Sequence, residues 1–368
     1  MNIPFVDLHA QYARIKDEID EAIRSVIADG AFIGGPYAKK FETEFSAWLG
    51  LKHTIACGNG TDSLEILMQA LGIGKGDEVI VPALSWISTS EAVSAIGATP
   101  VFVDIHPQTY TLDPALIEAA ISPRTKAIIP VHLYGHPAHM PEIMEIAGKY
   151  DLKVIEDCAQ SHGAKIEDKL AGTWGHCASF SFYPGKNLGA YGDAGAMATN
   201  DDTLARKARM IANHGQYYTK HVHEIEGRNS RLDGIQAAIL SVKLPYLETW
   251  TAERISRAEK YYQLLSGTDI TPPSVGKNAK HVYHLFVVQV ENRDAKMAEL
   301  TAAGIQCAVH YPTPLPLLDA YKHRGYTKED FPVAWQVTQH GISLPMYPEL
   351  SDEGIVYVAG KLTKPAYV

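Results

Sequence analysis

The chain has 368 residues, of which 46% are hydrophobic and 20% charged, as in ordinary globular proteins. This balance excludes intrinsic disorder and fibrous repeats, and the length favours one large domain with a smaller one. The formal net charge is −9, and no block of Lys and Arg exceeds two residues, which argues against a protein that binds the nucleic-acid backbone.

The sequence has no segment that fits a membrane span, because its uncharged apolar runs are far shorter than the roughly 18 residues required. The N-terminus lacks the basic and apolar regions of a secretory signal, so we expect a cytoplasmic protein. The cysteines are Cys57, Cys158, Cys177 and Cys307. Since they are far apart and form no C-x-x-C pair, we expect them to be reduced and mostly structural.

From residue 54 to about 200, short β-branched runs alternate with longer amphipathic segments, a pattern typical of a parallel sheet covered by helices. The predicted strands span residues 53–57, 78–81, 99–103, 127–131, 153–156, 178–182 and 195–199. Helices are expected between most of them. The first of these predicted helices presents Leu64, Leu67, Met68 and Leu71 on one face and ends near Gly72. Another predicted helix covers residues 141–150.

After residue 230 the pattern changes to a long predicted helix over 235–266, interrupted at Pro245. A strand over 283–290, a helix over 294–303 and a strand over 306–311 are predicted to follow. We therefore expect a domain boundary between 245 and 275. Drawn at residue 250, it separates a large domain of residues 1–250 from a small α+β domain of residues 251–368.

The first candidate site is the turn at residues 58–63, between a strand and a helix. Free backbone N–H groups and the positive end of a helix dipole make such a turn a cradle for phosphate. The alternative is a plain turn in which Thr61 or Asp62 caps the helix and Glu65 completes a capping box. A carboxylate repels phosphate, so we expect backbone N–H groups and the Thr61 hydroxyl to make the contact, while Asp62 caps or points away.

Asp157 follows the predicted strand at 153–156, at the sheet edge where open α/β folds collect their ligands. Its carboxylate either caps the next segment or holds a cationic ring nitrogen or a metal. No metal cluster is expected, because His162 stands alone and His221 and His223 lie in a polar loop.

Lys186 lies in a turn bounded by Gly and Pro after the predicted strand at 178–182. Such a lysine is commonly a solvated surface charge. Among Phe182, Tyr183 and backbone dipoles, however, desolvation can lower the pKa of its ammonium group, as a Schiff-base amine requires. A phosphate turn, a strand-end aspartate and this lysine are together the groups that bind pyridoxal phosphate.

Six motifs follow one another along the chain: FIGG at 32–35 with FE at 41–42, NGTD at 59–62, GDEVIVP at 76–82, EDCAQSHG at 156–163, SF at 181–182 followed by Lys186, and NSRLD at 229–233 with QAA at 236–238. In these motifs the chain resembles the DegT/DnrJ/EryC1/StrS family of sugar aminotransferases over essentially its full length. The resemblance implies the aspartate-aminotransferase-like fold (fold type I). That fold has a large domain with a mixed, mostly parallel sheet and a small α+β C-terminal domain.

The resemblance also implies catalytic and ring-binding roles. Lys186 would attach to pyridoxal phosphate as a Schiff base and then move protons as acid and base, and Asp157 would pair the pyridinium nitrogen. Gln160 would lie near the phenolic oxygen of the cofactor. Trp86 would stack on the ring, and its alternative role is core or interface packing.

The phosphate, by the same resemblance, would be bound by Gly60, Thr61 and Ser181. Asn229 would reach that phosphate from the neighbouring subunit. The resemblance thus implies a homodimer with a shared active site, in which a monomer is inactive.

The family transfers an amino group, usually from glutamate, to a keto-sugar attached to a nucleoside diphosphate, so a UDP- or dTDP-linked sugar is expected. Members that act at C4 tend to carry a Glu-Gly-Gly element after the lysine loop. Here the loop at 183–190 is followed by GDAG at 192–195, which resembles members acting on 3-keto sugars. C3 is therefore favoured, with C4 of a 4-keto-6-deoxy sugar as the alternative.

Four residues are candidates for substrate binding. The Arg231 guanidinium suits a carboxylate or diphosphate, and its alternative is a salt bridge between subunits. Tyr183, His310 and Tyr311 match positions that line the sugar pocket in relatives, although a structural role fits each equally well.

Two other functions are weighed. Relatives that dehydrate their substrate replace the lysine with histidine, and Lys186 argues against that reaction. Early members of the family were described as regulators, but the sequence has no DNA-binding module and no basic stripe.

Overall fold

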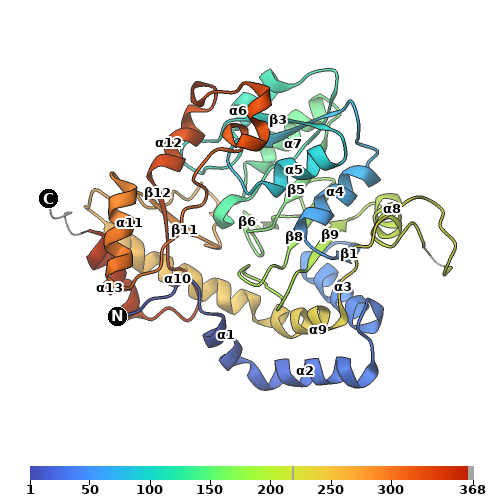
Figure 1. Cartoon of the computed structure of the whole chain (residues 1–368), viewed down its shortest axis with the longest axis horizontal. Coiled ribbons are helices and arrows are strands. Elements are labelled where there is room, and N and C mark those ends of the chain that lie inside the picture. Colours follow the sequence, from blue (N-terminus) through green and yellow to red (C-terminus); the bar gives the residue numbers. More distant parts are fainter. Residues whose placement is uncertain (218, 364–368) are drawn as a thin grey trace.

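The computed structural model describes residues 1–217 and 219–363. Its centre is a seven-stranded sheet in the order β1-β9-β8-β5-β4-β2-β3 (Figure 1). The strands are β1 (His53–Cys57), β2 (Glu78–Pro82), β3 (Thr99–Val103), β4 (Thr125–Ile128), β5 (Lys153–Asp157), β8 (Cys177–Ser181) and β9 (Gly195–Thr199). Because β9 runs opposite to the other six strands, the sheet is mixed and mostly parallel, as predicted.

Helices cover both faces of this sheet. The α-helices of the described residues are α1 (Leu8–Arg14), α2 (Lys16–Asp29), α3 (Gly35–Leu49), α4 (Gly60–Ala70), α5 (Ser88–Ala95), α6 (Pro114–Ile117), α7 (Met140–Lys149), α8 (Asp202–Ala212), α9 (Gly234–Lys243), α10 (Leu247–Leu265), α11 (Arg293–Ala302), α12 (Pro332–His340) and α13 (Asp352–Leu362). Strand residues alternate between the faces: Ile55 packs with α4 and α8, whereas Ala56 packs with α3 and α9. In the same way Ile155 packs with α4, and Val154 packs with α7.

A group of phenylalanines supports the segment that carries Lys186. The ring of Phe45, from α3, lies 5.0 Å from the ring of Phe180 and 5.3 Å from that of Phe182, in edge-to-face contacts. Phe41 contacts Phe182 in the same manner at 5.3 Å. These rings are fully buried, so the end of β8 rests on a packed core.

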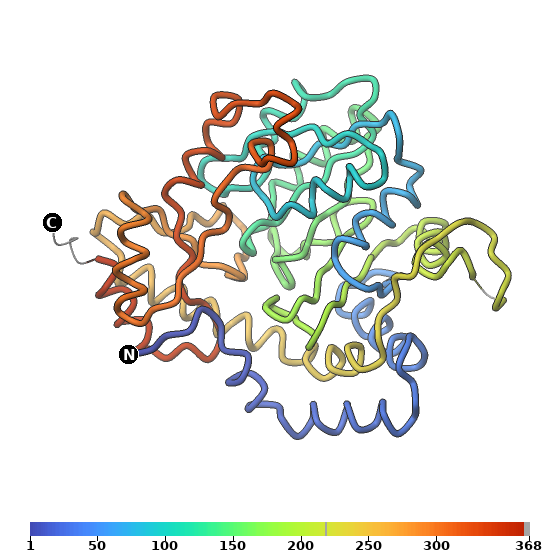
Figure 2. The backbone as a smooth tube through the Cα atoms, viewed as in Figure 1, coloured from blue at the N-terminus to red at the C-terminus, as the bar shows by residue number. Residues whose placement is uncertain are grey.

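The C-terminal part has its own small sheet, formed by β11 (Phe286–Gln289) and β12 (Gly341–Leu344) in antiparallel pairing. Helices α10, α11 and α13 pack against it around Tyr261, Phe286 and Ile355. Figure 2 shows the N-terminal segment lying along this part, where Ile3 pairs with Ile305. Helix α10 runs across residue 250, and the domain boundary proposed there stays a prediction.

Three short strands form a third sheet in the order β10-β6-β7: β6 (Lys165–Ile166), β7 (Lys169–Leu170) and β10 (Ala279–Lys280). No helix among the described residues combines the length and apolarity needed to cross a membrane. The four cysteines are free, and Cys307 alone is not fully buried.

The C-terminal predictions need two corrections. The predicted strand at 306–311 is wrong: Ala308 makes one isolated bridge to Ser343, and prolines follow at 312 and 314. The pairing strand is instead β12, which the sequence analysis missed because four residues are too few for a clear periodic signal. The predicted break in the long helix is confirmed, since a 3₁₀ turn at Leu244–Tyr246 separates α9 from α10.

Candidate active site

A cavity of about 570 Å³ lies at the carboxyl ends of the parallel strands and is also lined by residues of the C-terminal part. It brings together ten of the twelve predicted site residues: Gly60, Thr61, Trp86, Asp157, Gln160, Ser181, Tyr183, Lys186, His310 and Tyr311. The two absent from its wall are Asn229 and Arg231. Lys186 and Asp157, more than twenty residues apart in sequence, therefore line one cavity.

Lys186 is held in a short loop whose backbone closes on itself. Its N–H donates to the Tyr183 carbonyl at 2.8 Å, and the Ala190 N–H donates to the Phe182 carbonyl at 2.8 Å. A side chain at Gly189 would meet the Pro184 carbonyl oxygen at 2.4 Å, so the turn requires glycine there. Burial lowers the pKa of Lys186 to about 8, and the Asp157 charge opposes this shift.

Asp157 ends β5 with its carboxylate held on both oxygens. Oδ1 accepts the Ala159 N–H at 3.1 Å, and Oδ2 accepts the Thr89 hydroxyl at 3.0 Å. Burial raises the pKa of Asp157, while these two hydrogen bonds and the Lys186 charge lower it. Thr89 lies 2.9 Å from the Ser85 hydroxyl, so the contact belongs to a buried chain of polar groups. The sequence analysis missed Thr89, although it follows the end of β2 by seven residues, on the ligand-binding side of the sheet.

A second buried polar cluster lies beside Asp157. Ligand atoms of His132, Glu156 and Cys158 lie within 4.8 Å of one another. His132 Nδ1 accepts the Ala138 N–H, which places the ring proton on Nε2, and Nε2 donates to Glu156 at 2.9 Å. Glu156 also accepts hydrogen bonds from three backbone N–H groups of residues 172–175. The hydrogen bonds of this cluster therefore hold β5 to the neighbouring segments.

The other histidines singled out from the sequence lie away from such clusters. His221 and His223 are exposed, as expected for a polar loop. His162 is buried against the rings of Phe180 and Phe182, and burial lowers its pKa to about 3. The imidazole of His162 is therefore neutral and packs in the core.

The N-terminus of α4 lines the cavity. The helix cap is Asn59, whose side chain accepts the Asp62 N–H at 2.8 Å, so the predicted caps Thr61 and Asp62 are wrong. Asp62 instead accepts the Ser230 hydroxyl at 2.6 Å and does not line the cavity, consistent with the expectation that it points away. A side chain at Gly60 would meet Ser181 Cβ at 2.7 Å, so only glycine leaves this close approach open.

Aromatic and amide groups also line the cavity. Trp86 is 57% exposed, and its ring lies 5.7 Å from the Tyr311 ring. Gln160 is held at both ends of its amide: Oε1 accepts the Tyr134 N–H at 2.6 Å, and Nε2 donates to the Tyr311 hydroxyl at 3.1 Å. The orientation of this amide is therefore fixed before any ligand enters.

These residues fit pyridoxal phosphate. The cradle at Gly60 offers unpaired helix N–H groups for a phosphate, and Asp157 offers a carboxylate for a cationic ring nitrogen. Lys186 offers an amine of lowered pKa, and Trp86 offers a flat apolar face. The cavity is large enough for a cofactor and a small substrate together.

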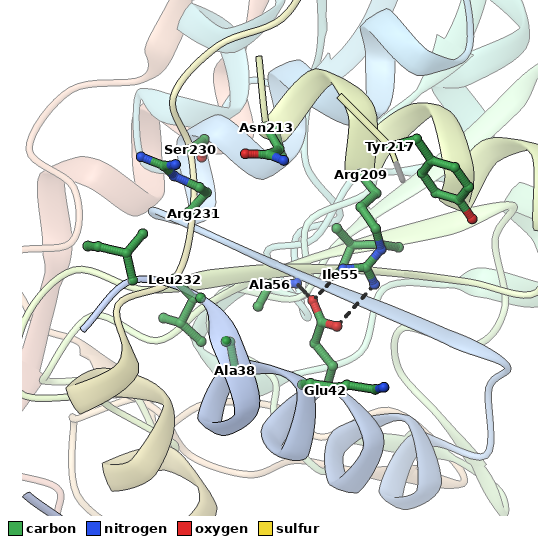
Figure 3. A pocket seen from close by; sticks show the side chains of 15 residues that line it. Ala38, Glu42, Ile55, Ala56, Arg209, Asn213, Tyr217, Ser230, Arg231 and Leu232 are labelled. Atoms are coloured by element: carbon green, nitrogen blue, oxygen red, sulfur yellow. Dashed lines mark hydrogen bonds and ion pairs between the residues drawn. The ribbon is translucent and has the colours of Figure 1, made fainter. Parts of the chain in front are cut away.

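The remaining two predicted residues lie elsewhere in the chain. Arg231 lines a separate cavity of about 490 Å³, together with Asn213 and the ion pair between Arg209 and Glu42 (Figure 3). Asn229 is exposed, and its backbone forms an isolated antiparallel β-bridge with that of Asn213. Within one chain, neither residue reaches the wall of the Lys186 cavity.

Arg254 and His284 are further cavity residues that were not identified from the sequence. Arg254 comes from α10 and His284 from the segment before β11. Neither stands in a motif with a chemical signature, because only the packing of the C-terminal part against the sheet brings them to the cavity.

Comparisons with known proteins agree with this geometry. The model of the DegT/DnrJ/EryC1/StrS aminotransferase family matches residues 13–363. The chain is 46% identical to a UDP-N-acetyl-3-dehydro-alpha-D-glucosamine 3-aminotransferase of Acidithiobacillus ferrooxidans, over 97% of this chain and 96% of the relative. It is also 46% identical to the UDP-2-acetamido-2-deoxy-3-oxo-D-glucuronate aminotransferase of Pseudomonas aeruginosa, over 98% and 99%. Among solved structures, S. venezuelae DesV in complex with a ketimine intermediate superposes with a TM-score of 0.96 at 42% identity, over 98% of each chain.

Proposed function

Because the chain belongs to the DegT/DnrJ/EryC1/StrS aminotransferase family and is a pyridoxal-phosphate-dependent sugar aminotransferase, we propose that it aminates a keto group at C3. The acceptor is a UDP- or dTDP-linked keto-sugar, and the amino donor is glutamate. The enzyme works in the cytoplasm. The observation that carries the reaction class is the shared cavity of Lys186 and Asp157, closed at one end by the anion cradle of α4.

The preference for C3 has two supports. The lysine loop at 183–190 is followed by GDAG at 192–195 and has no Glu-Gly-Gly element. The two nucleotide-sugar relatives described above are named for a 3-amino transfer and for a 3-oxo substrate. Amination at C4 of a 4-keto-6-deoxy sugar is the alternative. Lys186 disfavours dehydration, and a cavity built for a cofactor disfavours a purely regulatory role.

When bound, pyridoxal phosphate supplies an electron sink for the carbon that loses its proton. The Lys186 Nζ atom holds that proton and returns it, since its lowered pKa allows both the charged and the neutral form near neutral pH. Asp157 holds the ring nitrogen through a carboxylate that Thr89 and the Ala159 N–H keep in place. Gly60, Thr61 and Ser181 hold the phosphate at the start of α4.

Substrate binding is assigned to the open side of the cavity. Tyr183 is 59% exposed at its mouth, which suits contact with a sugar nucleotide. His310 is held by the Ser343 hydroxyl at 2.8 Å, and Tyr311 by Gln160, so both present fixed polar groups to the sugar.

A homodimer with a shared active site explains the position of the remaining residues. Asn229 and Arg231 are exposed and outside the Lys186 cavity of their own chain. We propose that Asn229 reaches the phosphate, and Arg231 the substrate, in the cavity of the neighbouring subunit.

The first test is spectroscopic. The purified protein is expected to absorb visible light through its cofactor, glutamate to bleach that absorption, and Lys186→Ala to abolish both effects. A wild-type spectrum that glutamate leaves unchanged contradicts transamination from this donor.

The position of amination is tested with glutamate and a panel of 3-keto and 4-keto nucleotide sugars. Product mass and NMR are expected to show a new amino group at C3. Turnover restricted to the 4-keto substrates would establish the alternative instead.

A further inference from the structure

Arg254 is a buried cation in the wall of the Lys186 cavity. It is only 4% exposed, and it stands on α10. Its Nη1 atom donates to the Met346 carbonyl at 2.7 Å and to the Tyr283 carbonyl at 3.3 Å. The donors Nε and Nη2 have no hydrogen-bond partner among residues 1–217 and 219–363, so half of the guanidinium fork is left for a ligand.

No carboxylate of the described chain lies at ion-pair distance from Arg254. The carboxylate that raises the pKa of Arg254 is that of Glu349, which is itself ion-paired with Arg14 at 3.2 Å. Burial lowers the pKa of Arg254 to about 10, so the group remains charged at neutral pH. Burying a charge that has only carbonyl partners costs desolvation free energy, and a carboxylate of a bound ligand would offset part of that cost.

The surroundings of Arg254 in the cavity also favour an anion. The charges of Lys186 and Arg254 both help to lower the pKa of His284, which also lines the cavity. Two acidic residues line it as well: Asp157, which is assigned to the ring nitrogen, and Asp193, which is exposed.

His284 presents a defined face to the same space. The Asn187 amide donates to the Val282 carbonyl at 3.1 Å, which leaves its oxygen to accept from His284 Nδ1 at 3.2 Å. This contact places a proton on Nδ1 of His284. Burial holds the pKa of His284 well below its usual range, so it lines the cavity with the arginine without adding a competing positive charge.

We infer that Arg254 binds a substrate carboxylate in the Lys186 cavity through the free side of its guanidinium fork. The inference rests on the proposed function, because transamination brings an amino acid whose α-carboxylate adjoins the carbon that reacts beside Lys186. That donor carboxylate is the expected source. A uronate carboxylate on the sugar has the same chemistry and is the other source.

The test compares Arg254→Gln with Arg257→Gln in the full-length holoenzyme. Arg257 is a matched control, because it stands one turn along α10 and also donates to two carbonyls, at 2.8 and 3.2 Å, outside the cavity. Glutamine at 254 can still donate to Met346 but lacks the charge and the fork. The donor arm measures the glutamate dependence of the visible absorbance change without a sugar, and calorimetric binding of glutarate. The acceptor arm measures KM for keto-sugars with and without a C6 carboxylate.

In Arg254→Gln, the affinity for glutamate and glutarate is expected to fall about 10- to 100-fold, while Arg257→Gln stays close to wild type. Arg254→Lys, which keeps the charge, should lose less, and this separates anion binding from a folding defect. A loss confined to uronate sugars assigns the carboxylate to the acceptor. Unchanged affinities in both arms overturn the inference. A wild-type enzyme that does not respond to glutamate contradicts the proposed donor instead.

Discussion

At Lys186, two opposing effects act on one amine. Burial destabilises its charged form, and the carboxylate of Asp157 stabilises that form. Burial is the larger effect, so the pKa falls to about 8 from an ordinary value of 10.5. A lysine with this pKa is partly neutral at physiological pH, whereas a solvated lysine is almost fully charged.

This shift predicts the pH dependence of cofactor uptake. Only the neutral amine attacks an aldehyde, and a lowered pKa makes that form available at lower pH. The rate at which apoenzyme captures pyridoxal phosphate is therefore expected to rise with pH and level off above about pH 8. Stopped-flow absorbance at several pH values measures it. Asp157→Asn should move the profile to lower pH, and a rate that still climbs above pH 10 would contradict the lowered pKa.

Thr89 is predicted to be a positioning residue, because it contacts the Asp157 carboxylate at 3.0 Å. Replacing it by valine preserves shape and removes a hydrogen bond to a charged group, which is worth about 1.5–3 kcal/mol. For Thr89→Val we expect kcat to fall roughly 10- to 100-fold with little change in KM for the sugar. Thr338→Val is the control, since that buried hydroxyl donates to the Trp335 carbonyl outside the cavity. Equal kcat values for Thr89→Val and wild type would rule out the role.

At the scale of elements, the start of α4 depends on close contact with β8. Gly60 leaves room for Ser181, and Asn59 caps the helix so that its first N–H groups face the cavity. The proposed anion cradle therefore includes two elements that pack closely together, α4 and β8.

Gly60→Ala tests that contact. Its Cβ would lie 2.7 Å from Ser181 Cβ, so α4 or β8 must shift. We expect affinity for pyridoxal phosphate to fall at least about tenfold, as measured by fluorescence titration of apoenzyme. Gly148→Ala on α7 is the matched control, because nothing lies within 4 Å of its Cβ. That substitution should leave cofactor affinity unchanged and stabilise the fold by about 0.5–1 kcal/mol. Normal cofactor affinity in Gly60→Ala would contradict the cradle.

At the scale of the whole molecule, the residues predicted to bind cofactor and substrate lie in two separate regions of the chain's structure. The cavity of Lys186 contains ten of the predicted residues. Asn229 and Arg231 lie outside it, on the segment between α8 and α9, where Asn229 pairs with Asn213. In the proposed homodimer, the region with Asn229 and Arg231 of one subunit would lie against the Lys186 cavity of the other subunit.

Subunit complementation tests this arrangement. Lys186→Ala and Asn229→Ala are each expected to be nearly inactive. In a mixture that has been dissociated and reassembled, half of the dimers are mixed, and each has one site with both native residues. About a quarter of the wild-type activity should therefore return. Mixing each variant with itself is the control, and light scattering gives the mass of the assembly. A monomeric protein, or no recovery on mixing, would contradict the shared site.

Local patterns were sufficient for the mixed α/β fold, the anion turn, the strand-end Asp157 and the lysine loop. Hydrophobic periodicity and turn residues act over a few positions, so a single sequence displays them, and the family motifs added the cofactor. The predicted cap of α4 and the predicted strand at 306–311 were wrong. Side-chain contacts determine which residue caps a helix, and pairing with a distant segment determines whether a strand forms. Thr89 meets Asp157 across 68 positions, and Arg254 meets Met346 across 92. No local signal encodes such contacts, since burial and packing between remote segments create them.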